Sequence, residues 1–90
     1  MTKKIKSWYV YILQCRDGTF YTGSTTDIVR RLCEHNSGKG GNYTRVRRPV
    51  KIIYKKSYPD RSSAQKREAR IKGLTRKEKA ALISQYQSIS

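Results

Sequence analysis

The densest run of hydrophobic residues in the chain extends from Trp8 to Leu13 and is apolar or aromatic at every position. A run that is apolar on both alternating faces is typical of a strand that is covered on both sides. We therefore expect this run to be the central strand of a sheet. The Asp17-Gly18 pair that follows is a strong hairpin signal, and it predicts that residues 20–22 return as a neighbouring strand.

A third strand is predicted over residues 50–58. Pro59-Asp60 should end it, because proline and aspartate favour a turn. If the first run is central, the other two strands lie on either side of it.

The segment between the second and third strands has the spacing of an amphipathic helix. The helix should begin at a cap on Thr25 or Thr26, carry Asp27 in its first turn and end near Ser37. On a wheel of about 100° per residue, four side chains share the apolar face that should pack on the sheet. They are Ile28, Val29, Leu32 and Cys33.

Two more helices should follow the third strand, each beginning with a capping box. The boxes pair Ser62 with Gln65 and Thr75 with Glu78. The predicted helices cover about 62–72 and 76–86, and Gly73 separates them. The element order is then β-β-α-β-α-α, which indicates an α/β fold of the α+β type.

Length and charge narrow the function. Ninety residues make one domain, expected over 1–90 with its core at about 8–86 and a short basic segment before it. Lys and Arg total 21 against six acids, a formal net charge of +15. Such an excess causes self-repulsion and favours an anionic partner, in the first place nucleic acid. A solvated basic surface without a partner is the simpler alternative.

The two cysteines, Cys15 and Cys33, lie in no CxxC pattern and have no histidine pair beside them. Neither zinc nor a disulfide is therefore expected, and both should be small buried hydrophobes. The apolar run behind the N-terminus is too short for a signal peptide, and no stretch is long enough to span a bilayer. We expect a cytoplasmic protein that does not bind membranes.

Two polar side chains of the first helix stand out by position. Arg31 and His35 lie one turn apart at the edge of the apolar face, so they should approach the strand end that carries Tyr21. Arg30 and Glu34 should point to solvent. The alternatives are a histidine that interacts with the helix C-terminus and tyrosines that only fill the core.

Glu68 is the one acid that the sequence leaves without a role in a turn, a helix start or an exposed face. It falls between Ala64 and Ile71 on the stripe that should pack against the sheet. A carboxylate there needs a partner, because burying an unpaired charge is costly. Two partners stay open: a structural ion pair with Arg31, or a cation that faces a phosphate.

Cations are dense in the loop that follows the first helix. Such a loop can neutralise phosphates, and its tyrosine could stack on a base, so it is the predicted nucleic-acid-binding segment. Its candidate residues are Lys39, Tyr43, Arg45, Arg47 and Arg48.

The ordered set of these residues resembles the GIY-YIG nuclease superfamily, in its small, single-domain branch of uncharacterised proteins. Tyr9-Val10-Tyr11 stands ten positions before Tyr21-Thr22-Gly23, and Arg31, His35 and Glu68 follow in order. The resemblance extends from Trp8 to about Ile83. Tyr9 replaces the family's first glycine, and Thr22 replaces its isoleucine.

The resemblance implies a three-stranded antiparallel sheet flanked by three helices, and hydrolysis of phosphodiester bonds. One divalent metal, Mg²⁺ or alternatively Mn²⁺, would be held by Glu68. Tyr11 and Tyr21 would position or deprotonate the attacking water. Arg31 would steady the phosphate, and His35 would also belong to the site.

The sequence therefore predicts a metal-dependent endonuclease that acts on DNA. A second domain that selects the DNA site, as in many family members, is not expected here, so targeting would depend on substrate structure or on a protein partner. The competing hypothesis is a non-catalytic DNA- or RNA-binding module that uses the same basic face. A third is a basic surface that docks on an acidic protein.

Overall fold

The computed structural model describes residues 7–89, so the basic segment 1–6 noted in the sequence lies outside the described residues. The elements follow the predicted order, with one additional short helix between α1 and β3. They are β1 (Trp8–Gln14), β2 (Phe20–Thr25), α1 (Ile28–Asn36), α2 (Asn42–Arg45), β3 (Lys51–Tyr58), α3 (Arg61–Lys72) and α4 (Arg76–Ile89). No helix in this part of the chain is both long and apolar enough to cross a bilayer.

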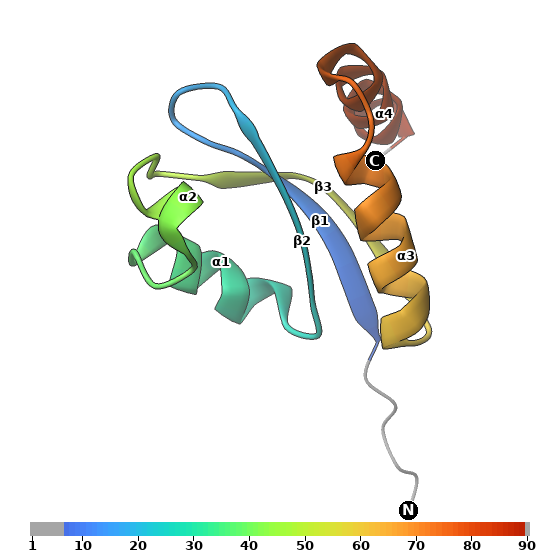
Figure 1. Cartoon of the computed structure of the whole chain (residues 1–90), viewed down its shortest axis with the longest axis horizontal. Helices are drawn as coiled ribbons and strands as arrows, with labels where there is room; N and C mark the ends of the chain where they lie inside the picture. Colours follow the sequence, from blue (N-terminus) through green and yellow to red (C-terminus); the bar gives the residue numbers. More distant parts are fainter. Residues whose placement is uncertain (1–6, 90) are drawn as a thin grey trace, which may run out of the picture.

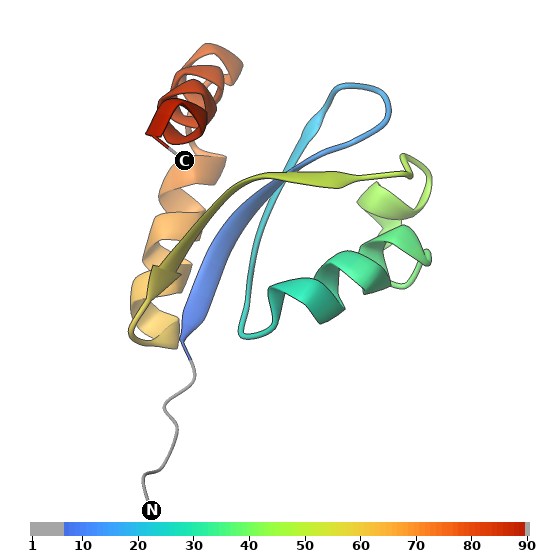
Figure 2. The same cartoon turned by 180° about the vertical axis from the view of Figure 1, so that it is seen from behind.

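The three strands form one antiparallel sheet in the order β2-β1-β3, which confirms the central position of the first strand. The helices α1 and α2 lie on one side of the sheet, and α3 and α4 lie on the other (Figure 1, and from behind Figure 2). The expected three-stranded antiparallel sheet flanked by helices is therefore confirmed, with the short α2 in addition to the three predicted helices.

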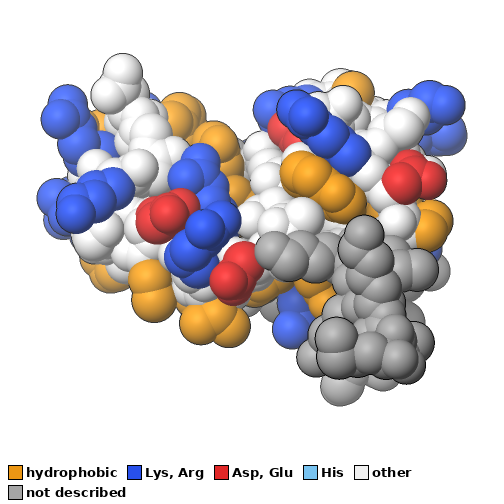
Figure 3. Space-filling model, turned by 90° about the horizontal axis from the view of Figure 1, so that it is seen from below, with side chains coloured by type: hydrophobic (Ala, Val, Ile, Leu, Met, Phe, Trp, Pro, Cys, Tyr) orange, Lys and Arg blue, Asp and Glu red, His pale blue; other side chains and the backbone are white. Residues whose placement is uncertain are grey.

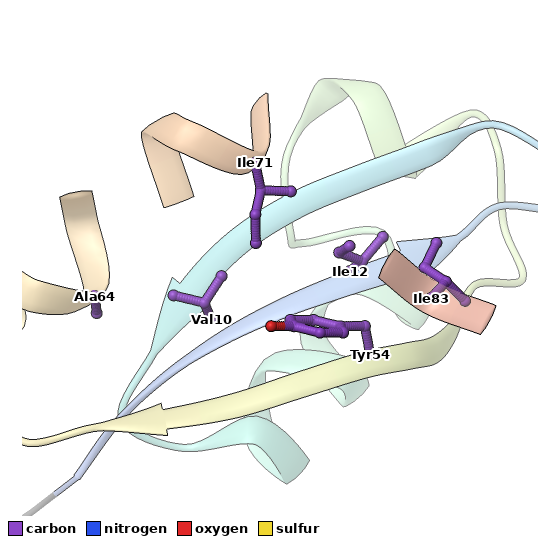
Figure 4. Packing of buried hydrophobic residues seen from close by; sticks show 6 residues of the cluster. All are labelled: Val10, Ile12, Tyr54, Ala64, Ile71 and Ile83. Carbon is purple, nitrogen blue, oxygen red and sulfur yellow. The ribbon is translucent and has the colours of Figure 1, made fainter. Parts of the chain in front are cut away.

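Each face of the sheet has its own hydrophobic core, because successive side chains of a strand point to opposite faces. Val10 and Ile12 of β1 belong to the core under α3 and α4, together with Tyr54, Ala64, Ile71 and Ile83 (Figure 4). Tyr11 and Leu13 belong to the core under α1, together with Cys15 and Val50. The dense apolar run is thus explained by two cores that share one strand.

The hairpin between β1 and β2 is built as the Asp-Gly signal predicts. The Asp17 carboxylate accepts hydrogen bonds from the Thr19 amide at 3.1 Å and from the Thr19 hydroxyl at 2.6 Å. Gly18 adopts φ of +85°, a left-handed conformation in which a residue without Cβ is favoured.

The predicted threonine cap of α1 is wrong. The N-cap is Asp27, whose side chain accepts a hydrogen bond from the Arg30 amide at 3.0 Å. The physical reason is that β2 is longer than predicted. Thr25 still pairs with Tyr9 in the sheet, so the helix cannot begin until two residues later.

The first of the two capping boxes is also wrong. Asp60 caps α3 by accepting from the Ser63 amide at 2.8 Å, which places the helix start before Ser62. The second box is confirmed: the Thr75 amide donates to Glu78 at 2.8 Å, and the Glu78 amide donates to the Thr75 hydroxyl at 3.1 Å.

The apolar face of α1 is narrower than predicted. Ile28 and Leu32 pack on the sheet, but Val29 is 74% exposed and Cys33 is exposed, so both were assigned to the core wrongly. Only an i, i+4 stripe of this short helix reaches the sheet, and its flanking positions face water. Cys15 is buried, as expected.

Mutation can test whether Asp27, rather than a predicted threonine, caps α1. Asp27→Ala removes the acceptor of the Arg30 amide and should lower the free energy of unfolding by about 1 kcal/mol. Thr26→Ala should change it by less than about 0.5 kcal/mol, as for a surface residue without a cap role. Urea denaturation measures both. Equal losses in the two variants would contradict the assignment of the cap.

Candidate active site

Tyr11 lies at the centre of the site because it stands in the middle of the central strand. Its partner in the register with β2 is Gly23, and a Cβ atom on that glycine would lie 2.6 Å from the Tyr11 hydroxyl oxygen. The Tyr11 ring therefore crosses directly over Gly23. Only a residue without a side chain fits there, which explains the glycine that follows Tyr21-Thr22.

A buried hydrogen-bonded chain links Tyr11 to α1 and α2. The Tyr11 hydroxyl lies 3.1 Å from His35 Nε2, and His35 Nδ1 lies 2.8 Å from the Thr44 hydroxyl. His35 and Thr44 are almost completely buried. His35 is therefore not at the rim, as the helical wheel predicted, but inside the site, with both ring nitrogens engaged.

Burial sets the protonation of this chain. It raises the pKa of Tyr11 to about 12, and the Arg31 guanidinium beside the hydroxyl only partly offsets the effect. Burial also lowers the pKa of His35, and the positive charge of Arg31 lowers it further. At neutral pH the site therefore holds a protonated tyrosine next to a neutral imidazole.

Arg31 is fixed by two acceptors. Its guanidinium donates to Glu34 Oε1 at 3.0 Å and to the Gly40 carbonyl at 2.9 Å. Burial opposes the charge of Arg31, but the hydrogen bonds to Glu34 and Tyr11 outweigh this and raise its pKa. The sequence predicted that Glu34 only faces solvent, but its carboxylate also holds Arg31 in place. Arg30 is 66% exposed, in agreement with the prediction.

The turn after α1 closes the site through Gly40. A Cβ atom on this glycine would clash with the His35 ring and with the His35 backbone, so the turn packs directly on the histidine. Sequence reasoning missed both Gly40 and Thr44. They lie in an irregular segment, and the only signal was the cluster of glycines around position 40.

Tyr21 extends the site outward as an aromatic stack. Its ring centroid lies 5.1 Å from that of His35 and 6.0 Å from that of Tyr43, which is stacked on it. The Arg47 guanidinium lies 4.0 Å from the centre of the Tyr43 ring. Four side chains from β2, α1, α2 and the following loop therefore form one wall of the site.

The predicted nucleic-acid-binding loop has a structural role in part. Arg47 donates to Asp17 at 3.1 Å and to the Tyr43 carbonyl at 2.9 Å, which ties the loop to the hairpin. Arg48 donates to the Arg45 carbonyl at 2.8 Å. Lys39 and Arg45 are exposed beside the site. Their role in binding nucleic acid stays a prediction.

Glu68 reaches the site from the other layer. Its carboxylate accepts from the Ser24 hydroxyl at 2.7 Å and pairs with Lys72 at 2.7 Å, and its side chain is 20% exposed. The ion pair with Arg31 that the sequence left open is not formed, because α3 and α1 cover opposite faces of the sheet. The negative charge of Glu68 still acts on Tyr11, raising its pKa as a minor contribution.

The view from below shows the outer surface at the end where β2 leads into α1 (Figure 3). Lys and Arg side chains stand on the side of α1 and on the side of α3 and α4, with Asp and Glu side chains among them on both sides. This end of the molecule therefore carries charges of both signs.

Glu68 is the candidate ligand for a divalent cation. Within residues 7–89, no three His, Cys, Asp or Glu side chains lie close enough together to hold a metal ion. Mg²⁺, however, is commonly bound by one or two carboxylates, with water and substrate phosphates completing its shell. A single, partly exposed carboxylate oriented by Ser24 fits that requirement. Lys72, which neutralises Glu68, is 54% exposed.

Comparison with known proteins places this arrangement in a family. The family model described as the GIY-YIG catalytic domain matches residues 7–81. A UPF0213 protein of Desulfotalea psychrophila is 55% identical over 86% of this chain and 71% of its own length. A UPF0213 protein of Halobacterium salinarum is 51% identical over 83% of this chain and 97% of its own length.

Two solution structures have the same fold. A protein of E. faecalis superimposes with a TM-score of 0.64 at 49% identity, covering 97% of this chain and 92% of that one. A UPF0213 protein of Bacillus halodurans superimposes with a TM-score of 0.58 at 45% identity, covering 87% of this chain and 83% of that one. The chain therefore belongs to the GIY-YIG family, and within it to the small UPF0213 proteins.

Proposed function

We propose that this protein is a metal-dependent endonuclease that hydrolyses phosphodiester bonds in DNA. The observation that supports it most is the buried hydrogen bond of 3.1 Å between Tyr11 and His35, with the Arg31 guanidinium beside it. Titratable groups whose pKa values are strongly shifted by burial and by a neighbouring charge are typical of catalytic sites.

The tyrosine acts as a base only together with the histidine. With a pKa of about 12, Tyr11 does not release its proton to solvent at neutral pH. It can accept a proton from the attacking water while it gives its own proton to His35 Nε2. This transfer requires the His35 tautomer that carries its proton on Nδ1 and donates it in a hydrogen bond to the Thr44 hydroxyl oxygen, 2.8 Å away, and it leaves the imidazole positively charged.

The substrate itself would promote this transfer. The neutral imidazole is favoured in part because the positive charge of Arg31 disfavours a second cation. A phosphate bound to Arg31 would cancel that charge and so make His35 a better proton acceptor. The base would then be activated mainly when DNA is in place.

Arg31 is well suited to hold the phosphate. Two of its five N–H donors are engaged by Glu34 and the Gly40 carbonyl, which fixes the plane of the guanidinium. The donors that neither these acceptors nor Tyr11 engage can bind phosphate oxygens, on which negative charge accumulates in the transition state. Tyr21, packed on His35, would position the water.

Glu68, oriented by Ser24, would hold the divalent cation, Mg²⁺ or Mn²⁺. When bound, the cation would supply charge stabilisation for the phosphate and the leaving oxygen. The net charge of +15 supports DNA as the substrate, since cations that neutralise phosphates provide most of the affinity for a duplex. Targeting would come from substrate structure or from a protein partner.

The second candidate function is a DNA- or RNA-binding module without catalysis. It is favoured by one observation: the pair of Glu68 with Lys72 satisfies the carboxylate without any metal. Nicking of supercoiled plasmid with Mg²⁺ or Mn²⁺, against EDTA, separates the two candidates. Binding without metal-dependent nicking would favour the module.

Two neighbouring arginines of α1 provide a matched test of the site. Both contact Glu34, but only Arg31 lies beside Tyr11. Arg31→Ala should lower the nicking rate by about 10²–10³-fold, as for loss of a donor to a transition-state oxyanion. Arg30→Ala should leave the rate within a few-fold of wild type. Similar losses in both variants would place the phosphate elsewhere.

Glu68→Gln tests the metal assignment against a structural role. The amide oxygen can still accept from Ser24, and Lys72, the lost partner, is 54% exposed and can be solvated, so the free energy of unfolding should change by about 1 kcal/mol or less. Metal-dependent nicking should be abolished, while DNA binding is kept or tightened. A loss of stability of about 3–5 kcal/mol would instead indicate a buried structural pair. Urea denaturation of wild type and Glu68→Gln, with and without Mg²⁺, measures the change in the free energy of unfolding.

The neutral state of His35 predicts a pH dependence of stability. Its pKa is lowered in the folded protein, so below the unfolded value of about 6.5 the unfolded chain binds more protons. Stability should therefore fall as the pH decreases from about 6.5 towards the folded pKa. His35→Gln should remove this component, whatever its effect on absolute stability. The urea midpoint of unfolding is measured across this pH range in wild type and in His35→Gln. If it changes equally with pH in both proteins, His35 is not a buried neutral histidine.

A further inference from the structure

An open pocket of about 440 Å³ lies between β3, α3 and α4, away from the candidate active site. The residues that form its floor are apolar or aromatic: Tyr54 from β3, which is only 4% exposed, and Leu82 and Tyr86 from α4. The Tyr54 and Tyr86 rings are tilted against each other with centroids 5.1 Å apart. Figure 2 shows β3 passing beside both helices at this side of the sheet.

Cations line the same pocket. Lys55 and Lys56 come from β3 and Arg67 from α3, and no Asp or Glu is among the lining residues in the described part of the chain. These charges therefore lack the acidic neighbours that neutralise Arg31 and Arg47 elsewhere. More broadly, residues 51–79 contain eleven of the 21 Lys and Arg residues and only three acids.

Arg67 brings a guanidinium to the pocket. The guanidinium interacts with the Tyr58 hydroxyl, and its Nε atom is buried, without a hydrogen-bond partner within residues 7–89 and out of reach of a ligand. The other N–H donors of the guanidinium suit a phosphate oxygen, which is an acceptor that arginine binds well.

The combination of these features identifies the ligand class. A bare phosphate would need the cations but not an aromatic floor, and an apolar ligand would need the floor but not the cations. An aromatic surface for a base beside cations for the backbone is the arrangement that binds single-stranded nucleic acid. Bases inside a duplex are stacked and paired, so only an unpaired base can enter.

We propose that this pocket binds an unpaired nucleotide, with its base on Tyr86 and Leu82 and its phosphate at Lys56 and Arg67. The candidate active site lies near β2, mostly on the α1 face of the sheet, and the pocket lies near β3 on the face that α3 and α4 cover. A nucleic acid that occupied both would pass around the edge of the sheet. Together with the proposed endonuclease function, on which this step rests, the substrate class is DNA in which a duplex adjoins a single strand.

Binding of a fluorescent oligothymidylate, measured by anisotropy in EDTA, tests the pocket without any catalysis. Tyr86→Leu keeps the apolar contact with Tyr54 but removes the aromatic face. Its affinity for the single strand should fall roughly five- to hundredfold, as for loss of one base–aromatic stack. Its affinity for a blunt duplex should stay within twofold of wild type. Tyr86→Phe should bind both ligands as wild type does.

The rim of the pocket is tested by a matched pair of lysines. Lys56→Ala should lower the log–log salt slope of single-strand binding by about 0.7, one phosphate contact. Lys77→Ala removes the same charge from an exposed position of α4 outside the pocket and should leave that slope unchanged. Thermal unfolding of each variant confirms that it is folded.

The proposal is overturned if Tyr86→Leu weakens single strand and duplex equally, if it weakens neither, or if the two lysine variants have the same slope. These outcomes are independent of nicking. A selective loss of single-strand binding in a protein that does not cut would support the pocket and count only against the endonuclease. A protein that nicks DNA, but whose Tyr86→Leu variant shows no selective loss of single-strand binding, would support the endonuclease and count against the pocket.

Discussion

The burial of β1 on both faces is the constraint on which the remaining structure depends. Alternate side chains of a strand point to opposite sides, so one short segment directs α3 and α4 to one face and α1 to the other. Tyr11 takes part in this packing as well as in the candidate chemistry. Its hydroxyl is held by the core rather than by a loop, and this rigidity allows a single hydrogen bond to His35 to be maintained in a domain of ninety residues. Catalytic groups mounted on rigid elements keep their geometry with less supporting structure.

Much of this arrangement follows from the period of regular elements. The apolar run from Trp8 to Leu13 predicted a central strand, and the spacing of Arg31 and His35 predicted that both approach Tyr21. Those predictions are confirmed because a strand and a helix have fixed repeats, which turn spacing in the sequence into direction in space. The family resemblance adds the chemistry, and comparison with known proteins confirms the family.

Other features of the site could not be predicted from the repeats of strands and helices. The helical wheel placed Glu68 on a sheet-facing stripe, which is what the structure shows, but a wheel cannot say which face of the sheet a helix covers. Of the two partners left open for Glu68, the ion pair with Arg31 is therefore not formed, and Glu68 contacts Ser24 and Lys72 instead. Thr44 and Gly40 lie in an irregular turn, where no repeat indicates that a hydroxyl and a missing side chain meet His35. The predicted caps of α1 and α3 failed for a related reason, because several Asp, Ser and Thr residues stand near each of these two helix starts and the sequence alone does not choose among them. The capping box of Thr75 and Glu78 is confirmed.

The division of the site between two layers also has a consequence for how the chain folds. His35 lies 24 residues after Tyr11, and Asp17 is tied to Arg47 across 30 residues, so the tyrosine, the histidine and the arginine come from one contiguous half of the chain. Glu68 joins them only through Ser24, 44 residues away, when α3 docks on the opposite face. Short loops close at a smaller entropic cost than long ones, which favours early assembly of the first half. In that order of assembly the candidate tyrosine, histidine and arginine meet before the carboxylate joins them, so the complete set of candidate residues exists only once α3 has docked.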